Sequence, residues 1–148
     1  MEIFSDEYFM QKAYQEAQKA EDIGEVPVGA IIVCNETVIA RAHNQIELLN
    51  DVTAHAEILA ITAASNYLSA KYLTECTLYV TLEPCSMCAG AIKWAQLGKL
   101  VYGAADDKNG FMKHGKDMLH PKTNVAFGLL HDKCSEILKG FFKNKRYS

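Results

Sequence analysis

Residues 77–98 read TLYVTLEPCSMCAGAIKWAQLG and contain the patterns of a strand and a helix in succession. The segment 77–81 is short and apolar, as in a buried strand. The helical pattern covers 86–97 and closes at a glycine. This unit predicts an α/β fold in which Cys85 and Cys88 lie where the helix begins.

Cys85 and Cys88 stand three residues apart, so both thiols project from one face of that helix. A helix N-terminus favours negative charge and lowers the pKa of such thiols. His55, upstream, adds an imidazole. One histidine and two cysteines suit zinc and leave a fourth tetrahedral position open for water, which a structural site would normally close. We therefore predict one catalytic Zn²⁺ held by His55, Cys85 and Cys88.

Glu57 lies two residues after His55 and is not needed to hold the metal. Zinc lowers the pKa of bound water from about 15.7 toward roughly 7. Glu57 can take that proton, protonate a ring nitrogen of the substrate and later deliver a proton to leaving ammonia. The pattern H-x-E…P-C-x-x-C is typical of the zinc nucleobase deaminases. These residues predict a hydrolytic deaminase with Glu57 as the acid–base group.

Each piece alone has a simpler interpretation. A C-x-x-C can be a redox pair, but thioredoxin-like motifs need no distant His-x-Glu. It can be half of a zinc finger, but no second C-x-x-C or H-x-x-x-H completes one. A lone histidine is more often structural, and a lone glutamate more often a solvated surface group. The joint pattern favours the catalytic interpretation.

Composition indicates one ordinary globular domain. The chain has 148 residues, with 49% hydrophobic and 22% charged residues, which suits a single domain over 1–148. The first residues are acidic, unlike a secretory signal, and the longest apolar run, 26–34, is too short to span a membrane. Cys34, Cys76 and Cys134 are expected to be reduced and packed. We expect a cytoplasmic enzyme with no membrane association.

The remaining elements follow from periodicity and turn residues. We expect helices over 6–22, capped by Ser5, over 54–69 and over 132–143, a hairpin of strands 28–33 and 37–41, and strands over 99–102 (ended by Gly103) and 125–128. A loop-rich stretch, 104–123, contains at most a helical turn near 115–119. Strands that alternate with helices, two of them paired as a hairpin, predict an α/β sandwich with a mixed sheet. In this layout two helix N-termini point at one metal.

Charge is distributed unevenly along the chain. Residues 1–60 hold 3 Lys+Arg and 11 Asp+Glu (net −8), and residues 61–148 hold 12 and 7 (net +5), which together give −3. The cations gather at Lys108, Lys113, Lys116 and Lys122, and again at Lys139, Lys143, Lys145 and Arg146. Such asymmetry can steer a polyanion to one side of the molecule, or it can mark a solvated loop and tail.

Several longer stretches carry a family resemblance. They are Glu25-Val26-Pro27-Val28-Gly29-Ala30, Asn44, Thr53-Ala54-His55-Ala56-Glu57-Ile58, the segment Leu78 to Ala91, and the basic, aromatic ending Phe141-Phe142-Lys143-Asn144-Lys145-Arg146. Together they resemble the bacterial tRNA-specific adenosine deaminases over nearly the whole chain. The zinc motif is shared with other deaminases, so the flanking segments carry the finer assignment.

The resemblance implies a homodimer with one zinc per subunit that converts adenosine to inosine at the wobble position of a tRNA anticodon stem-loop. It implies the cytidine-deaminase-like fold, a three-layer α/β/α sandwich with a five-stranded mixed sheet. It further implies that Asn44 contacts the target base and that Asp106 belongs to a loop that meets the neighbouring nucleotides. By the same resemblance Val26, Pro27, Ala56 and Pro84 shape the pocket, and Phe142, Lys143, Lys145 and Arg146 contact RNA.

The sequence departs from the family pattern after Gly110. Many members continue with small residues and a Gly-Ser, whereas this chain reads Phe111-Met112-Lys113-His114-Gly115-Lys116. Because this loop is expected to touch RNA, the substrate rather than the chemistry is put in question. Two other functions are weighed against this one: a deaminase of a free base or nucleoside of the guanine or cytosine type, which would use the same zinc site, and a non-catalytic zinc-stabilised binding protein, which would not need Glu57. Trp94 and Met87 are expected in the core or at a dimer contact, and Phe141 and Phe142 either pack the last helix or stack on bases.

Overall fold

The computed structural model describes residues 2–146 and is built around one five-stranded sheet. Its strands are β1 (Gly29–Cys34), β2 (Thr37–His43), β3 (Cys76–Leu82), β4 (Lys99–Ala104) and β5 (Asn124–Phe127), in the order β2-β1-β3-β4-β5. β1 pairs antiparallel with β2 and β3, whereas β3, β4 and β5 are parallel. The predicted mixed sheet is confirmed.

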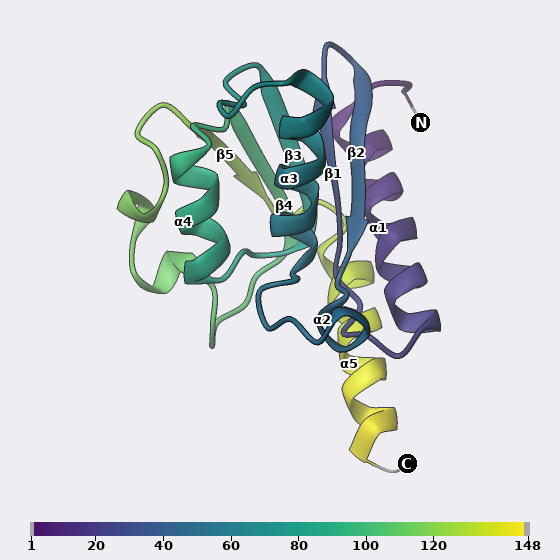
Figure 1. The fold of residues 1–148 in the computed structure, drawn as a ribbon. Helices are drawn as coiled ribbons and strands as arrows, with labels where there is room; N and C mark the ends of the chain where they lie inside the picture. The colour runs from purple at the N-terminus through teal and green to yellow at the C-terminus, as the bar shows by residue number, and fades with distance from the viewer. Residues whose placement is uncertain (1, 147–148) are drawn as a thin grey trace.

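Helices cover both faces of the sheet (Figure 1). One layer contains α1 (Asp6–Asp22) and α5 (His131–Arg146), and the other contains α3 (Ala56–Leu68) and α4 (Ser86–Trp94). A short α2 (Ile46–Leu49) and two 3-10 turns, η1 (Phe111–Lys113) and η2 (Lys116–Met118), lie in the loops. Within residues 2–146, no helix combines the length and apolar character needed to span a bilayer.

Alternation along the central strands creates a core on each side of the sheet. In β1, Ile31 and Val33 join Phe9 and Met10 of α1, while Ile32 joins the α3–α4 side. Successive strand side chains point to opposite faces, and because both faces are covered the interior strand β1 carries no charged side chain. Each helix layer therefore has its own apolar surface to pack against.

Small residues let the helices approach the sheet closely. A Cβ on Gly29 would overlap the backbone of Ala13 and Ala17 in α1. On the other face, α3 presents Ala56, Ala60 and Ala64, all fully buried, at a four-residue spacing. The position of α3, and with it of His55 and Glu57, is thus set by close alanine packing.

Several element boundaries differ from the sequence prediction. The helix expected over 54–69 begins at Ala56, because His55 is extended (φ −73°, ψ 152°) and serves as its N-cap. The helix expected over 86–97 ends at Trp94, since Gln96 takes a left-handed conformation (φ 53°). The last helix runs from His131 to Arg146 rather than over 132–143.

Strand ends were also misplaced by the pattern. The strand expected to stop at Gly103 continues to Ala104, which pairs with Leu82 and accepts a hydrogen bond from the backbone nitrogen of Glu83. α2 was not predicted. Its backbone is capped by a residue far away in sequence, Glu25, which no local pattern reveals.

Candidate active site

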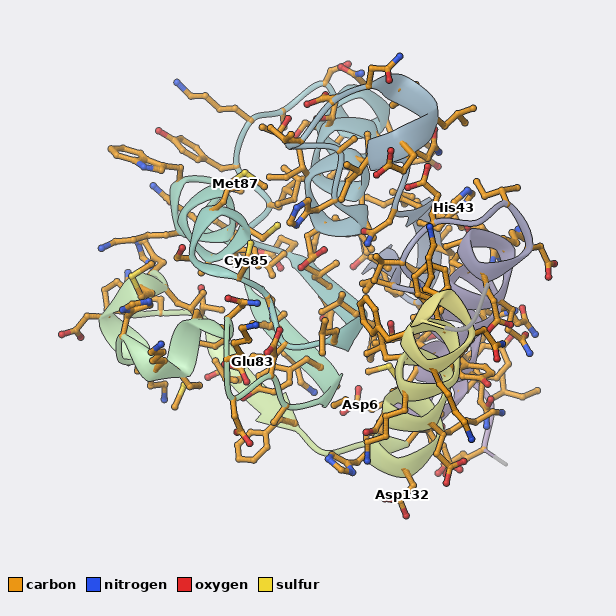
Figure 2. All side chains as sticks on the ribbon, turned by 90° about the horizontal axis from the view of Figure 1, so that it is seen from below. Asp6, His43, Glu83, Cys85, Met87 and Asp132 are labelled. Carbon is orange, nitrogen blue, oxygen red and sulfur yellow. The ribbon has the colours of Figure 1, made fainter. Side chains whose placement is uncertain are left out.

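The predicted site residues gather at one end of the sheet. α3 and α4 both begin there, next to the carboxyl ends of β3 and β4, and α2 and the loop after β4 lie at the same end (Figure 1). The carboxyl ends of parallel strands are the usual position of a site in such sheets. The connection from β3 to α4 carries Glu83 and Cys85; in the view of this end, Cys85 lies at α4 and Glu83 lies on the side of the loop after β4 (Figure 2).

Three side chains at this end form a group that could hold a metal ion. The ligand atoms of His55, Cys85 and Cys88 all lie within 4.8 Å of one another. The Nδ1 atom of His55 is 3.7 Å from the sulfur of Cys85 and 3.5 Å from that of Cys88. Bonds of about 2.3 Å to sulfur and about 2.0 Å to nitrogen, meeting at a tetrahedral angle, separate such atoms by about 3.5 Å. The three residues therefore fit a tetrahedral zinc ion.

Helix caps explain why these side chains point at one place. His55 is the N-cap of α3 and Cys85 the N-cap of α4, and the side chain of neither is used to cap its helix. Cys88 lies in the first turn of α4. The prediction that two helix N-termini converge on one site is confirmed.

The two cysteine thiols have opposite pKa shifts. The pKa of Cys85 is lowered to about 4, mainly by its hydrogen bond with Cys88 and also by His55, although partial burial opposes this. The pKa of Cys88 is raised by the same hydrogen bond and by burial.

Glu57 is enclosed beside this group. Its side chain is buried, and burial raises the pKa of its carboxyl group to about 7. A carboxyl group of that kind can hold a proton or release it near neutral pH. Since Glu57 follows His55 by two residues at the start of α3, the same helix N-terminus places both the candidate metal ligand and the candidate acid–base group.

A cavity of about 410 Å³ opens onto these groups. It is lined by Val28, Asn44, His55, Glu57, Leu82, Glu83, Cys85, Ser86, Asp106, Lys108, Asn109, Lys113 and His114. Its volume is within the range of small-molecule sites. Asn44 is buried in the wall, and its Oδ1 accepts a hydrogen bond of 2.8 Å from the backbone nitrogen of Ala56.

Two buried carboxylates hold the loops on either side of the cavity. Glu25 accepts backbone hydrogen bonds from Glu47 (3.1 Å) and Leu48 (2.8 Å) at the start of α2. Glu83 accepts them from Asp106 (3.0 Å) and Met112 (2.9 Å) in the loop after β4.

Gly110 passes so close to Glu83 that a Cβ there would overlap its carboxylate. Glu83 was not predicted as a site residue. Its position directly before the Pro-Cys-x-x-Cys motif was the only signal in the sequence.

The other predicted pocket residues take different positions. Asp106 lines the cavity, and its carboxylate accepts hydrogen bonds from the backbone nitrogens of Lys108 (3.2 Å) and Asn109 (3.0 Å). In the described part of the chain, the four other residues predicted to shape the pocket are not among those that line the cavity, whose aliphatic lining is supplied by Val28 and Leu82. Of these four, Val26 is half-buried, and Pro27, Ala56 and Pro84 are buried.

The predicted RNA-contacting residues lie on α5, outside the cavity lining. Phe142 is exposed, as are Lys143 and Lys145, while Phe141 is half-buried and lies against Phe142 edge-on. α5 ends at the same end of the molecule as α2 (Figure 1). The side chain of Arg146 lies outside the described part of the structure.

Comparison with known proteins identifies the family. The family model of the MafB19-like deaminases matches residues 4–146. A tRNA-specific adenosine deaminase of Agrobacterium fabrum is 44% identical over 144 residues, which cover 94% of this chain and 95% of the relative. The chain belongs to the tRNA-specific adenosine deaminase family. The prediction of a hydrolytic deaminase is confirmed.

Solved structures agree with this membership of the tRNA-specific adenosine deaminase family. A chain from a study of A-to-I editing by tRNA:A34 deaminases at the wobble position superposes with a TM-score of 0.83 at 43% identity, covering 88% of this chain and 99% of that one. The predicted cytidine-deaminase-like fold is thereby confirmed. A guanine deaminase of Bacillus subtilis is 40% identical with a TM-score of 0.66, but covers 68% of this chain and 65% of that one.

Proposed function

We propose that this protein hydrolyses adenosine to inosine at the wobble position of a tRNA anticodon. The observation that carries the proposal is the buried Glu57 carboxyl group in a cavity it shares with His55 and Cys85. The nearly full-length likeness to tRNA-specific adenosine deaminases supports the substrate. The reaction consumes one water and releases one ammonia.

We infer that the group formed by His55, Cys85 and Cys88 holds one zinc ion per subunit. The choice of zinc is supported by the borderline-soft donor set and by the distances between the donors. A zinc ion held there would supply a Lewis acid that makes water a nucleophile near neutral pH. Since Cys88 is buried and Cys85 half-buried, the protein also limits the access of bulk water to the metal.

Glu57 carries the protons. Its carboxylate takes a proton from the attacking water and gives it to the purine ring nitrogen beside the carbon under attack, which makes that carbon electrophilic. It then passes the second proton of the same water to the departing amine, which leaves as ammonia. Burial excludes bulk water that would otherwise exchange these protons.

Asn44 is proposed to orient the base. Its Oδ1 accepts a hydrogen bond from the backbone nitrogen of Ala56, so its NH₂ group is the part of the amide that can donate a hydrogen bond to the base. Asp106 and the loop it stabilises would meet the nucleotide beside the target. Val26, Pro27, Ala56 and Pro84 are proposed to support the pocket from behind the wall.

RNA rather than a free base is favoured by the chain's cations and aromatic residues. The exposed Phe142, Lys143 and Lys145 of α5, continued by Arg146, offer a stacking group and positive charge to single-stranded RNA. A free-base deaminase does not need these groups. Deamination of a free base is the second candidate function, because the chain also resembles a guanine deaminase of Bacillus subtilis. That resemblance covers less of both chains than the resemblance to the tRNA:A34 deaminase structure does.

We further propose a homodimer formed through the α3–α4 layer. Trp94 is 83% exposed, and Met87, Tyr67 and Tyr72 are exposed as well, so of the two positions expected for Trp94 and Met87, the core or a dimer contact, the core is excluded. Exposed large apolar side chains on one layer mark a protein contact surface. Sedimentation should find a dimer for the wild type and a monomer for Trp94→Glu. A wild-type monomer at micromolar concentration would contradict this.

The substrate is tested by incubating the protein with an adenosine-containing anticodon stem-loop and, separately, with guanine, cytosine and free adenosine. We expect inosine and ammonia from the stem-loop only. Release of ammonia from guanine or cytosine, with none from the stem-loop, would establish the second candidate instead.

A further inference from the structure

Two nitrogen-bearing side chains that the reaction above does not use line the cavity. Lys113 and His114 line it together with Glu57 and His55, and both are exposed, so they reach solvent at its mouth. Neither is needed to bind a metal, to carry a proton or to shape the base pocket. They follow Gly110 in the segment where the sequence departs from the pattern of its family.

The backbone before these two residues is fixed at two points. Phe111 is fully buried and packs edge-on against Tyr102, with ring centroids 5.9 Å apart. Met112 donates its backbone hydrogen to the buried carboxylate of Glu83. Phe111 begins the turn η1, and the backbone nitrogens of Lys113 and His114 bond back to Gly110 (3.3 Å) and Phe111 (2.9 Å). Lys113 and His114 therefore leave a rigid turn in a set direction.

The charge of Lys113 is not neutralised within the protein. Across residues 2–146, neither an ion pair nor a side-chain hydrogen bond involves Lys113 or His114. Nearby Asp106 directs its carboxylate to backbone nitrogens of its own loop. A cation kept without a partner at the mouth of a cavity is suited to an external anion.

A nucleic acid presents one kind of anion at such a mouth. Adenine and ribose are neutral, whereas phosphodiester groups on both sides of the target nucleotide are charged and stay outside the pocket when the base enters it. We propose that Lys113 and His114 form a phosphate subsite that binds a phosphodiester group adjoining the target nucleotide. This inference rests on the proposed function and deepens it, because the subsite would select RNA over a free base.

Lys113→Ala and His114→Ala test the subsite, with Lys116→Ala as the matched control. Lys116 belongs to the same loop but lines a different hollow, with Lys93 and Asp117. We expect Lys113→Ala to raise KM for the stem-loop about tenfold, the usual effect of one charged hydrogen bond, with kcat nearly unchanged. The slope of log KM against log salt should fall by about 0.7. Lys116→Ala should behave as the wild type.

Substrate changes identify the phosphate. Replacing the phosphodiester beside the target with a neutral methylphosphonate should raise the KM of the wild type about tenfold, as Lys113→Ala does. The same replacement should leave the KM of Lys113→Ala unchanged. Free adenosine and 5′-AMP are run in parallel. Turnover of 5′-AMP that depends on Lys113 would show that the subsite takes a terminal phosphate, and an equal loss on free adenosine would show that Lys113 acts on the base. Either result overturns the proposal.

Failure of this inference can be told apart from failure of the proposed function. If the wild type forms no inosine from the stem-loop, both are wrong. If it forms inosine but Lys113→Ala and Lys116→Ala have equal KM values, only the phosphate subsite is wrong.

Discussion

The side-chain oxygen of Asn44 lies 2.8 Å from the backbone nitrogen of Ala56 and accepts its hydrogen bond. Ala56 is the first residue of α3 and stands between His55 and Glu57. A pocket asparagine thus caps, from outside the helix, the turn that carries His55 and Glu57, the residues proposed to bind the metal and to carry the protons. Under the proposed function, base recognition and the position of Glu57 therefore depend on the same side chain.

The structural role of the Asn44 oxygen and the proposed binding role of its NH₂ group can be tested separately. Asn44→Asp keeps the oxygen that caps α3 but removes the NH₂ donor, so the melting temperature should stay near that of the wild type while turnover falls. Asn44→Ala removes both, and should also lower the free energy of unfolding by about 1 kcal/mol, the usual value of such a cap. Full turnover by a stable Asn44→Asp protein would contradict a role in binding the base.

The metal assignment predicts a clear difference between two cysteines. We expect the wild type to bind zinc and Cys88→Ser to lose it, whereas Cys34→Ser, with a half-buried thiol on β1, should keep it. A chelator should lower the stability of the wild type, by about 2.7 kcal/mol if free zinc had been at a hundredfold excess over Kd, and leave Cys88→Ser unchanged. Elemental analysis and thermal melts measure both effects. Equal zinc contents in the two variants would rule out Cys88 as a ligand.

Glu83 should act as the anchor of the loop after β4. Glu83→Gln keeps one acceptor oxygen and turns an NH₂ group toward the other backbone donor, so we expect a loss of about 1–3 kcal/mol in the free energy of unfolding. Hydrogen exchange should accelerate at the amides of Asp106 and Met112. The exposed Glu75→Gln is the control, expected within about 0.5 kcal/mol of the wild type. Unchanged exchange at both amides would show that Glu83 does not hold the loop.

Acid stability should depend in part on Asp6. Partial burial by itself would raise its pKa, but hydrogen bonds from Tyr79 and Lys99 and the charge of Lys99 outweigh it, so the pKa lies below the ordinary 3.8. A lowered folded-state pKa contributes stability above the unfolded-state pKa, and that stability is lost as pH falls through the folded-state value.

Asp6→Asn should therefore be less stable than the wild type at pH 7, by less than about 1 kcal/mol because Asp6 and Lys99 are both more than a third exposed. The difference should disappear toward pH 2 in urea titrations. A difference that grows on acidification would have the wrong sign.

Local patterns identified most of the elements that build this site. Ser5 caps α1 as expected, with its hydroxyl accepting from the backbone nitrogen of Tyr8, and His55, Glu57, Cys85 and Cys88 meet as predicted. Each motif is local, but the meeting of the two motifs is a long-range contact, and it was predictable because the joint H-x-E…P-C-x-x-C pattern is typical of zinc nucleobase deaminases.

Other long-range contacts could not be predicted in this way. Glu25 and Glu83 act on backbone groups more than twenty residues away, so nothing near them in sequence signals their role. The family resemblance implies that Phe111 belongs to an RNA-facing loop, whereas its side chain is fully buried. Tertiary packing, not local propensity, decides which side of such a loop faces the core.

The central claim is that water, activated beside Glu57, replaces the amine of an adenosine in RNA. It is tested most directly by a single turnover on the anticodon stem-loop in ¹⁸O-labelled water, with mass spectrometry of the nucleosides. We predict inosine with one solvent oxygen and one ammonia per turnover, formed about 10²–10⁴ times more slowly by Glu57→Gln that retains its metal. Inosine without the label, or an unchanged rate for Glu57→Gln, would contradict the account.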